Sequence, residues 1–387
     1  MKRRGLAGLT AAAVLLLGCW TPVSAEEAGP ALAEGARSAI LMELETGTVL
    51  FEKNADEALE PASVTKIMTM ALVLEDVNAG KIRMEDMVTA SERAKEMGGT
   101  QINLDVGEQM SVYDLLMSVA VASANDAAVA LGEYAGGSEE AFVERMNRKA
   151  EELGMENTHF VNTNGLPAEG HVTSARDIAL MSRFLLSFDQ AVEFTGTDRY
   201  PIRSGEDEYM MRNSNALVRE YDGCIGLKTG YTENAGHCLS SAATRDGMTV
   251  IAVVMGESDS KVRFQESKEL LDYAFAHYEL YRPEVSFASP GEIPVKMGET
   301  ARVGVLAPEQ TVAPVVIARG AEPQLEVVTR IEPFVTAPVE EGDVVGRTTV
   351  SLNGKEAGVY EYRAAASVER RDFLSSLCLV LRQMITL

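Results

Sequence analysis

Apolar and polar positions recur with regular spacing in the part of the chain that precedes residue 282. Two apolar runs flank Glu45-Thr46-Gly47 and predict a β-hairpin over residues 37–57. After Pro61, apolar residues at helical spacing predict a helix that stops at Asn78-Ala79-Gly80. The chain therefore begins its first domain with a hairpin and a helix.

The same spacing predicts the rest of this domain. The helical pattern returns from 112 to 153, where VASAND and YAGGS interrupt it, and again from about 174 to 186. Strand-like runs follow at 224–231, 237–243 and 248–257, and an amphipathic helix is predicted over 259–278. Strands at both ends with helices between them indicate a mixed sheet built from both termini of one α+β domain.

The pattern changes after Tyr281. Short runs rich in Val, Thr and Gly have no helical period, and they predict a separate small all-β domain over 288–367. The hairpin turn of this domain at Ser351-Leu352-Asn353 is recognisable from its composition.

The last residues, 369–387, have the pattern of an amphipathic helix. Most of the polar residues of this segment would lie away from one apolar face. That face would be formed by six large residues, Phe373, Leu374, Leu377, Leu381, Met384 and Ile385. The segment is too short and too charged to span a bilayer, so we expect it to lie in the membrane interface as a peripheral anchor. The alternative is a C-terminal helix that docks on the protein's own core.

The N-terminus has the features of a secretory signal over residues 1–25. Three basic residues precede an apolar stretch, and small residues at Val23, Ser24 and Ala25 indicate cleavage after Ala25. An alternative is a lipoprotein signal at Leu16-Leu17-Gly18-Cys19, which would leave Cys19 acylated. Either signal predicts an extracytoplasmic protein, and the tail at 369–387 predicts that it is peripheral on the outer face of the cytoplasmic membrane.

Composition narrows the class of function. A length of 387 residues with 46% hydrophobic residues fits two domains. A formal net charge of -23 leaves no basic surface for phosphates, so we exclude nucleic acid as a partner. The acidic balance fits a solvated secreted protein, although other soluble enzymes share it.

Cysteine and histidine give no sign of a metal or cofactor. In the globular part only Cys224 and Cys238 remain, and export permits a disulfide between them without establishing one. No CxxC occurs and the four histidines are scattered, so we expect neither a metal site nor a cofactor.

Ser63 and Lys66 introduce the candidate chemistry. A serine at a helix start and a lysine one turn later project to the same side, within reach of each other. A lysine removed from water has a lowered pKa, so Lys66 could accept the proton of the Ser63 hydroxyl. The alternative is a surface lysine after a capping serine, but Val64, Ile67 and Met68 make a solvated position unfavourable.

Two further short patterns have the same ambiguity when taken singly. Ser123-Ala124-Asn125 lies between helical runs, where it offers hydrogen-bonding side chains or an ordinary helix cap. Lys228-Thr229-Gly230 ends a strand, where a cation and a hydroxyl could meet a carboxylate and glycine would admit a substrate close to the backbone. The alternative is a strand that simply runs into a turn.

Together the three patterns resemble the S-x-x-K, S-x-N and K-T-G set of the serine penicillin-recognising enzymes. More narrowly, the chain resembles the low-molecular-weight penicillin-binding proteins that are D-alanyl-D-alanine carboxypeptidases, and GLKTGYTENAGHCLSSAA and RFQES also match. The resemblance covers signal, catalytic domain over 36–282, β domain and tail. It implies a β-lactamase/transpeptidase-like fold with helices on an antiparallel sheet.

The resemblance also implies roles for individual residues. Ser63 would attack the carbonyl between the terminal D-alanines of a peptidoglycan stem peptide, and β-lactam antibiotics would acylate it too. Lys66 would be the base, while Ser123 and Lys228 would pass a proton to the leaving amine. The substrate-binding residues would be Asn125 for an amide, Thr229 and Arg263 for the carboxylate, Gly230 for close approach, and the Tyr231 and Ser63 backbone N–H groups as the oxyanion hole.

Other functions share these residues. A β-lactamase would need an efficient deacylating group and no β domain or tail. An endopeptidase that cleaves peptidoglycan cross-links would differ only in its products. A binding module with an inactive site is disfavoured because all six motif side chains are intact. The lead-in Gly223-Cys224-Ile225-Gly226 departs from the pattern and leaves the geometry of that strand open.

Overall fold

The computed structural model describes residues 31–203, 205 and 208–372. The signal predicted over residues 1–25 lies outside the described residues. So do all six apolar residues of the predicted amphipathic tail, from Phe373 onward.

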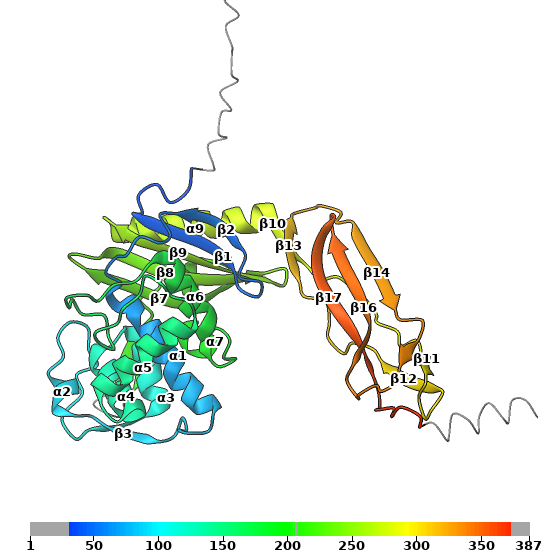
Figure 1. The fold of residues 1–387 in the computed structure, drawn as a ribbon. Helices are drawn as coiled ribbons and strands as arrows, with labels where there is room; N and C mark the ends of the chain where they lie inside the picture. The colour runs from blue at the N-terminus through cyan, green and yellow to red at the C-terminus, as the bar shows by residue number, and fades with distance from the viewer. Residues whose placement is uncertain (1–30, 204, 206–207, 373–387) are drawn as a thin grey trace, which may run out of the picture. The chain divides into compact units, whose positions relative to one another are not determined.

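The first domain is built on a five-stranded sheet (Figure 1). Its strands, in spatial order, are β2 (Val49–Lys53), β1 (Ser38–Glu43), β9 (Met248–Glu257), β8 (Gly236–Arg245) and β7 (Cys224–Thr232). Strands from both ends of the domain share this sheet, which confirms the sequence prediction. Every pairing in it is antiparallel, so the expectation of a mixed sheet is wrong and the one drawn from the resemblance is confirmed.

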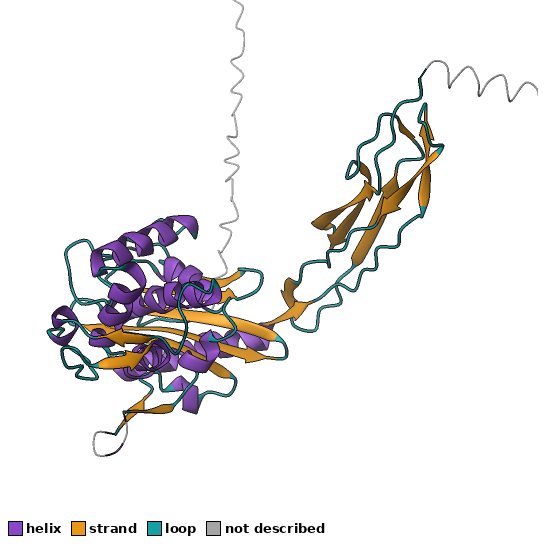
Figure 2. Cartoon of the chain, turned by 90° about the horizontal axis from the view of Figure 1, so that it is seen from below, coloured by secondary structure: helices purple, strands orange, loops and turns teal. Residues whose placement is uncertain are grey.

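Helices cover both faces of this sheet (Figures 1 and 2). One face is covered by α9 (Ser260–His277) and the other by a helical layer. The longer helices of that layer are α1 (Lys66–Asn78), α3 (Val112–Met117), α4 (Asn125–Gly136), α5 (Glu139–Glu152) and α6 (Ala175–Leu185). These bounds confirm the predicted helices and both predicted interruptions.

Shorter elements connect the helical layer. They are the 3₁₀ helix Ala62–Thr65, the π-helical turn Ser118–Ala122, and the helices α2 (Glu92–Lys95), α7 (Ala191–Thr195) and α8 (Leu217–Glu220). Two small hairpins pair β3 (Met87–Thr89) with β4 (Gln109–Ser111) and β5 (Arg199–Ile202) with β6 (Tyr209–Arg212).

Helix α1 lies at the centre of the domain. Most of its residues are buried on every side, which is the pattern of a helix surrounded by protein rather than one with a solvated face. Its first residue, Lys66, is fully buried. A lysine is almost never fully buried unless its amine has polar or charged partners. The position of Lys66 therefore requires a specific polar environment, which the site supplies.

The lead-in to β7 contains a β-bulge, which resolves the geometry left open by the sequence. The register shifts between Cys224 and Gly226. Gly226 has φ +103, and a Cβ atom there would lie 2.0 Å from the Thr195 carbonyl oxygen, so only glycine fits. Leu227 follows with φ +84. The bulge thus turns the strand immediately before Lys228.

Between α9 and residue 372 the chain is built of strands and loops (Figure 2). Strand β10 (Tyr278–Tyr281) pairs with β13 (Val315–Ala318). A six-stranded sheet has the order β14 (Leu325–Ile331), β16 (Val344–Leu352), β17 (Lys355–Ala364), β12 (Arg302–Leu306), β11 (Glu292–Lys296) and β15 (Val335–Thr336). The predicted all-β character and the turn at Asn353 between β16 and β17 are confirmed.

Two sequence-based expectations concern the end of the described chain and the thiols. Residues 369–372 are not helical, and the Glu369 carbonyl accepts a hydrogen bond from the Glu299 N–H at 2.9 Å, so the predicted helix start at 369 is wrong. Among the residues described, no helix is long and apolar enough to cross a membrane. Cys224 and Cys238 are free thiols.

We predict that Gly226→Ala destabilises the first domain far more than Gly247→Ala. Both glycines have positive φ, but a Cβ at Gly247 meets nothing within 4 Å. The control should lose about 1–2 kcal/mol from backbone strain alone, and Gly226→Ala about 3 kcal/mol or more because overpacking is added. Urea unfolding followed by circular dichroism measures both. Equal losses would mean that the bulge tolerates a side chain.

Candidate active site

Ser63 and Lys66 form a direct contact at the start of α1. Ser63 is half-buried in the 3₁₀ helix, and the Lys66 Nζ lies 2.9 Å from its Oγ. Nζ also donates to the Asn125 Oδ1 and to the Asn164 carbonyl oxygen, both at 2.6 Å. These last two atoms can only accept, whereas a hydroxyl can also donate. A neutral Lys66 would therefore keep all three contacts while its lone pair faces the Ser63 hydroxyl.

The electrostatic setting favours that neutral form. Burial holds the pKa of Lys66 well below its ordinary value, and the positive charge of Lys228 acts in the same direction, whereas Asp126 opposes it. Burial, followed by the charge of Arg263, lowers the pKa of Lys228 to about 7. The two lysines are both fully buried. The site can thus hold one amine as a base and a second that changes charge near neutral pH.

The second motif lies beside this pair. Ser123 ends the π-helical turn in a left-handed conformation, with φ +64, and is 7% exposed. Asn125 begins α4 and is the residue that reaches Lys66. Its Nδ2 donates to the Gly98 carbonyl oxygen at 2.6 Å, and its backbone N–H donates to the Thr100 carbonyl oxygen at 2.8 Å. Asn125 therefore joins Lys66 to the segment after α2.

The third motif approaches from strand β7. A Cβ at Gly230 would lie 2.8 Å from the Pro61 carbonyl oxygen, so glycine allows the strand to pass directly beside the turn that carries Ser63. Thr229 donates through Oγ1 to the Ser214 Oγ at 2.7 Å. The motif lies near the end of β7, which continues to Thr232, one residue beyond the predicted run.

Arg263 contacts this strand segment from α9, and Tyr231 belongs to the strand itself. Arg263 lies in α9 and donates through Nη1 to the Gly230 carbonyl oxygen at 3.0 Å. Burial lowers its pKa. Tyr231 is 57% exposed, and its ring stacks on His237 at a centroid distance of 4.3 Å. Two cations, Lys228 and Arg263, therefore lie close together in a protein whose net charge is strongly negative.

Two residues that sequence reasoning missed complete the site. Asn164 supplies the carbonyl oxygen that Lys66 contacts, and the next residue, Gly165, has φ +86 with no room for a Cβ beside Ala62. Ser214 is the partner of Thr229, and its N–H donates to the Val121 carbonyl oxygen in the π-helical turn. The Asn-Gly dipeptide marks a turn in the sequence, but nothing there indicates what the turn packs against.

A buried histidine supports the turn that carries Ser63. The Val161 N–H donates to the His171 Nδ1 at 3.0 Å, so the proton lies on Nε2, which contacts the Thr65 Oγ1 at 2.8 Å. Thr65 in turn donates to the Ala62 carbonyl oxygen at 2.9 Å. Burial lowers the pKa of His171 to about 4, so this chain of hydrogen bonds is neutral above that pH. No pattern in the sequence singles out His171.

Comparison with known proteins identifies the same family. The family described as D-alanyl-D-alanine carboxypeptidase matches residues 24–259, and penicillin-binding protein 5, C-terminal domain, matches 277–370. D-alanyl-D-alanine carboxypeptidase DacF of Bacillus subtilis is 39% identical over 89% of each chain. DacC of Escherichia coli, another D-alanyl-D-alanine carboxypeptidase, is 37% identical over 91% of this chain and 88% of that protein.

A solved structure agrees with the sequence relatives. Penicillin-binding protein 5 from Haemophilus influenzae has a TM-score of 0.73 and 29% identity, and the match covers 88% of this chain and 99% of that one. The resemblance drawn from the three motifs is therefore confirmed over both the helical and the all-β parts. From these matches and from the motifs that meet around Lys66, we conclude that the chain belongs to the D-alanyl-D-alanine carboxypeptidase family.

Proposed function

We propose that the protein is a serine D-Ala-D-Ala carboxypeptidase that removes the terminal D-alanine from peptidoglycan stem peptides. The observation that carries this proposal is the 2.9 Å contact between the Ser63 Oγ and the buried Lys66 Nζ. The names of the relatives support a carboxypeptidase over the predicted alternatives, an endopeptidase or a β-lactamase. The chemistry needs no metal or cofactor, because Lys66 supplies the base.

Acylation follows from the contacts of Ser63. Its Oγ attacks the carbonyl carbon between the two terminal D-alanines, and the hydroxyl proton passes to Nζ of Lys66. The backbone N–H groups of Ser63 and Tyr231 stabilise the resulting oxyanion. The peptide C–N bond then breaks, and the proton taken up by Lys66 passes through Ser123 and Lys228 to the departing D-alanine amine, so that Lys66 is neutral again. Water hydrolyses the acyl-enzyme and regenerates Ser63.

Substrate recognition uses the cationic end of the site. Thr229 and Arg263 hold the terminal carboxylate, and the charge of Lys228 adds to their attraction. Asn125 holds a substrate amide, and Gly230 keeps the strand open to the peptide backbone. The positive charge is local, which is how an acidic protein binds an anion. Penicillins carry a carboxylate and a reactive amide, so they acylate the same serine.

We predict that Ser63→Ala abolishes both D-alanine release and the mass increase caused by penicillin. Lys66→Ala should be nearly as severe, a loss of roughly 10⁴-fold or more, because nucleophile and base act as a unit. Mass spectrometry after penicillin, and D-alanine assay with a stem peptide, measure the two activities. Ser138→Ala, at the half-buried N-cap of α5, is the matched control and should stay active. Substantial turnover without Ser63 would refute the assignment.

A second prediction concerns pH and Lys228. Because kcat/KM reports the free enzyme, its value for a D-Ala-D-Ala peptide should fall as pH rises through about 7, where Lys228 loses its proton and its attraction for the carboxylate. Lys228→Arg stays charged at all these pH values. The residual kcat/KM of that variant should not fall over this pH range. A fall that persists unchanged in the variant would assign the titration to another group.

The location of the protein is the last part of this proposal. We infer that it works outside the cytoplasm, where peptidoglycan lies, and that residues 373–387 hold it at the membrane surface. The apolar residues from Phe373 to Ile385 would enter the acyl boundary while Arg382 stays with anionic headgroups. Such an anchor is reversible.

Deletion of residues 373–387 should therefore move the enzyme from the membrane fraction to the supernatant. Turnover of a small soluble peptide should be unchanged, because all three motifs lie before residue 264. The measurement is activity in both fractions for the full-length and truncated proteins. Retention of the truncated form on membranes would favour acylation at Cys19, and unfolding would show that the tail belongs to the core.

A further inference from the structure

Asp126 is a buried carboxylate next to the active site, and no step of the proposed chemistry uses it. It follows Asn125 in the first turn of α4 and is fully buried. Its Oδ2 accepts from the Leu104 N–H at 3.0 Å, and both of its oxygens lie 3.2 Å from the Ile102 nitrogen. Its Oδ1 also accepts from the Ala127 N–H at 2.9 Å. Both oxygens of Asp126 therefore bind the backbone of the neighbouring segment, and Oδ1 also binds the backbone of its own helix.

The segment held in this way is 98–104, and it also contacts Asn125. The carbonyl oxygens of Gly98 and Thr100 accept from the Asn125 side chain and backbone. A Cβ at Gly99 would lie 2.8 Å from the Asn125 Nδ2, so the segment lies directly against that amide. The same Asn125 side chain accepts a hydrogen bond from Lys66 through its Oδ1.

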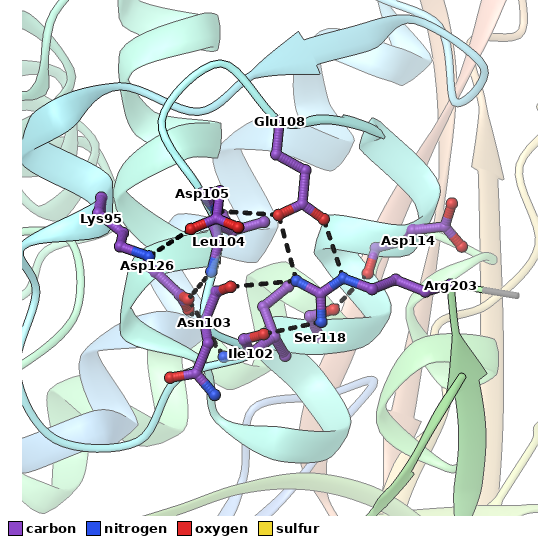
Figure 3. A network of polar contacts seen from close by, with 10 residues as sticks. All are labelled: Lys95, Ile102, Asn103, Leu104, Asp105, Glu108, Asp114, Ser118, Asp126 and Arg203. Atoms are coloured by element: carbon purple, nitrogen blue, oxygen red, sulfur yellow. Dashed lines mark hydrogen bonds and ion pairs between the residues drawn. The ribbon is translucent and has the colours of Figure 1, made fainter. Parts of the chain in front are cut away.

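Arg203 holds the same segment from its other side (Figure 3). Its guanidinium donates to the Ile102 carbonyl oxygen at 3.0 Å and to that of Asn103 at 3.2 Å. It also pairs with Glu108 at 2.9 Å. The segment is therefore held between two charged groups, a buried carboxylate on the N–H side and a guanidinium on the carbonyl side.

We propose that Asp126 is a positioning residue of this active site: its carboxylate holds segment 98–104 so that Asn125 can contact Lys66 and the substrate amide together. The proposal rests on the function proposed above. Arg203 contributes to the same arrangement from outside. The alternative is that Asp126 serves only the stability of α4, as a buried aspartate in a first turn often does.

The charge of Asp126 provides a second readout besides the acylation rate, because its carboxylate acts on the pKa of Lys66. Asp126 and Lys228 act on the pKa of Lys66 in opposite directions, and His171, the other titratable group beside it, is neutral near pH 7. Removal of the Asp126 charge should lower the pKa of Lys66 further. The acid limb of penicillin acylation is the fall in its rate at low pH, where Lys66 gains its proton. This fall should then occur at lower pH.

The test compares Asp126→Asn with Asp177→Asn. Asp177 is a matched control, because it is also buried in the first turn of a helix, α6, and also accepts a backbone N–H of a distant segment, that of Asn157 at 2.8 Å. Both variants should lose stability. Only Asp126→Asn should slow penicillin acylation, by about tenfold to a hundredfold as expected for a displaced site group, and shift its acid limb.

The outcomes are distinct from those that test the proposed function. If the wild-type protein takes up no penicillin and releases no D-alanine, the function fails. If the wild type reacts but Asp126→Asn acylates with the rate and pH profile of Asp177→Asn, the positioning role is overturned. Should Asp126→Asn not fold, Arg203→Gln decides: slower acylation with an unshifted acid limb supports the role of the segment, and an unchanged rate overturns it.

Discussion

A single amine removed from water, that of Lys66, sets the conditions that the rest of the catalytic domain meets. A buried lysine amine without partners would cost several kcal/mol. Its nitrogen must therefore meet hydrogen-bonding groups that the fold holds in place. The three neighbours of Nζ come from the helix start, from α4 and from the turn at Asn164. Segments far apart in the chain are therefore required to meet at one nitrogen.

Close packing around this nitrogen depends on glycines. Gly165 brings its turn against Ala62, Gly230 brings β7 against Pro61, and Gly99 lies against Asn125. A side chain at any of these positions would separate a motif from its neighbours. The backbone is also strained nearby, since Ala62, Ser123 and Leu227 adopt positive φ at or next to the three motifs. Each such residue stores on the order of 1–3 kcal/mol, which the surrounding packing must offset.

The sequence predicts the elements of this fold well because its hydrophobic spacing is regular. The hairpin, the interrupted helices and the three motif positions all follow from periodicity or from short patterns. The details that set the chemistry do not. The carbonyl oxygen of Asn164 has no side-chain signature, because any residue offers one. The β-bulge before Lys228 and the partner Ser214 depend on which distant segments meet, and a single sequence does not encode that in a local pattern.

The two lysines of the site have different surroundings. Lys66 has two fixed acceptors and the nearby Asp126, whereas Lys228 has the Thr229 carbonyl oxygen and a cation, Arg263, near it. Both are fully buried, so burial alone does not distinguish them. The placement of the other charges does distinguish them: a carboxylate lies near Lys66 and a guanidinium near Lys228. Asp126 opposes the effect of burial on the pKa of Lys66, whereas Arg263 adds to the effect of burial on the pKa of Lys228.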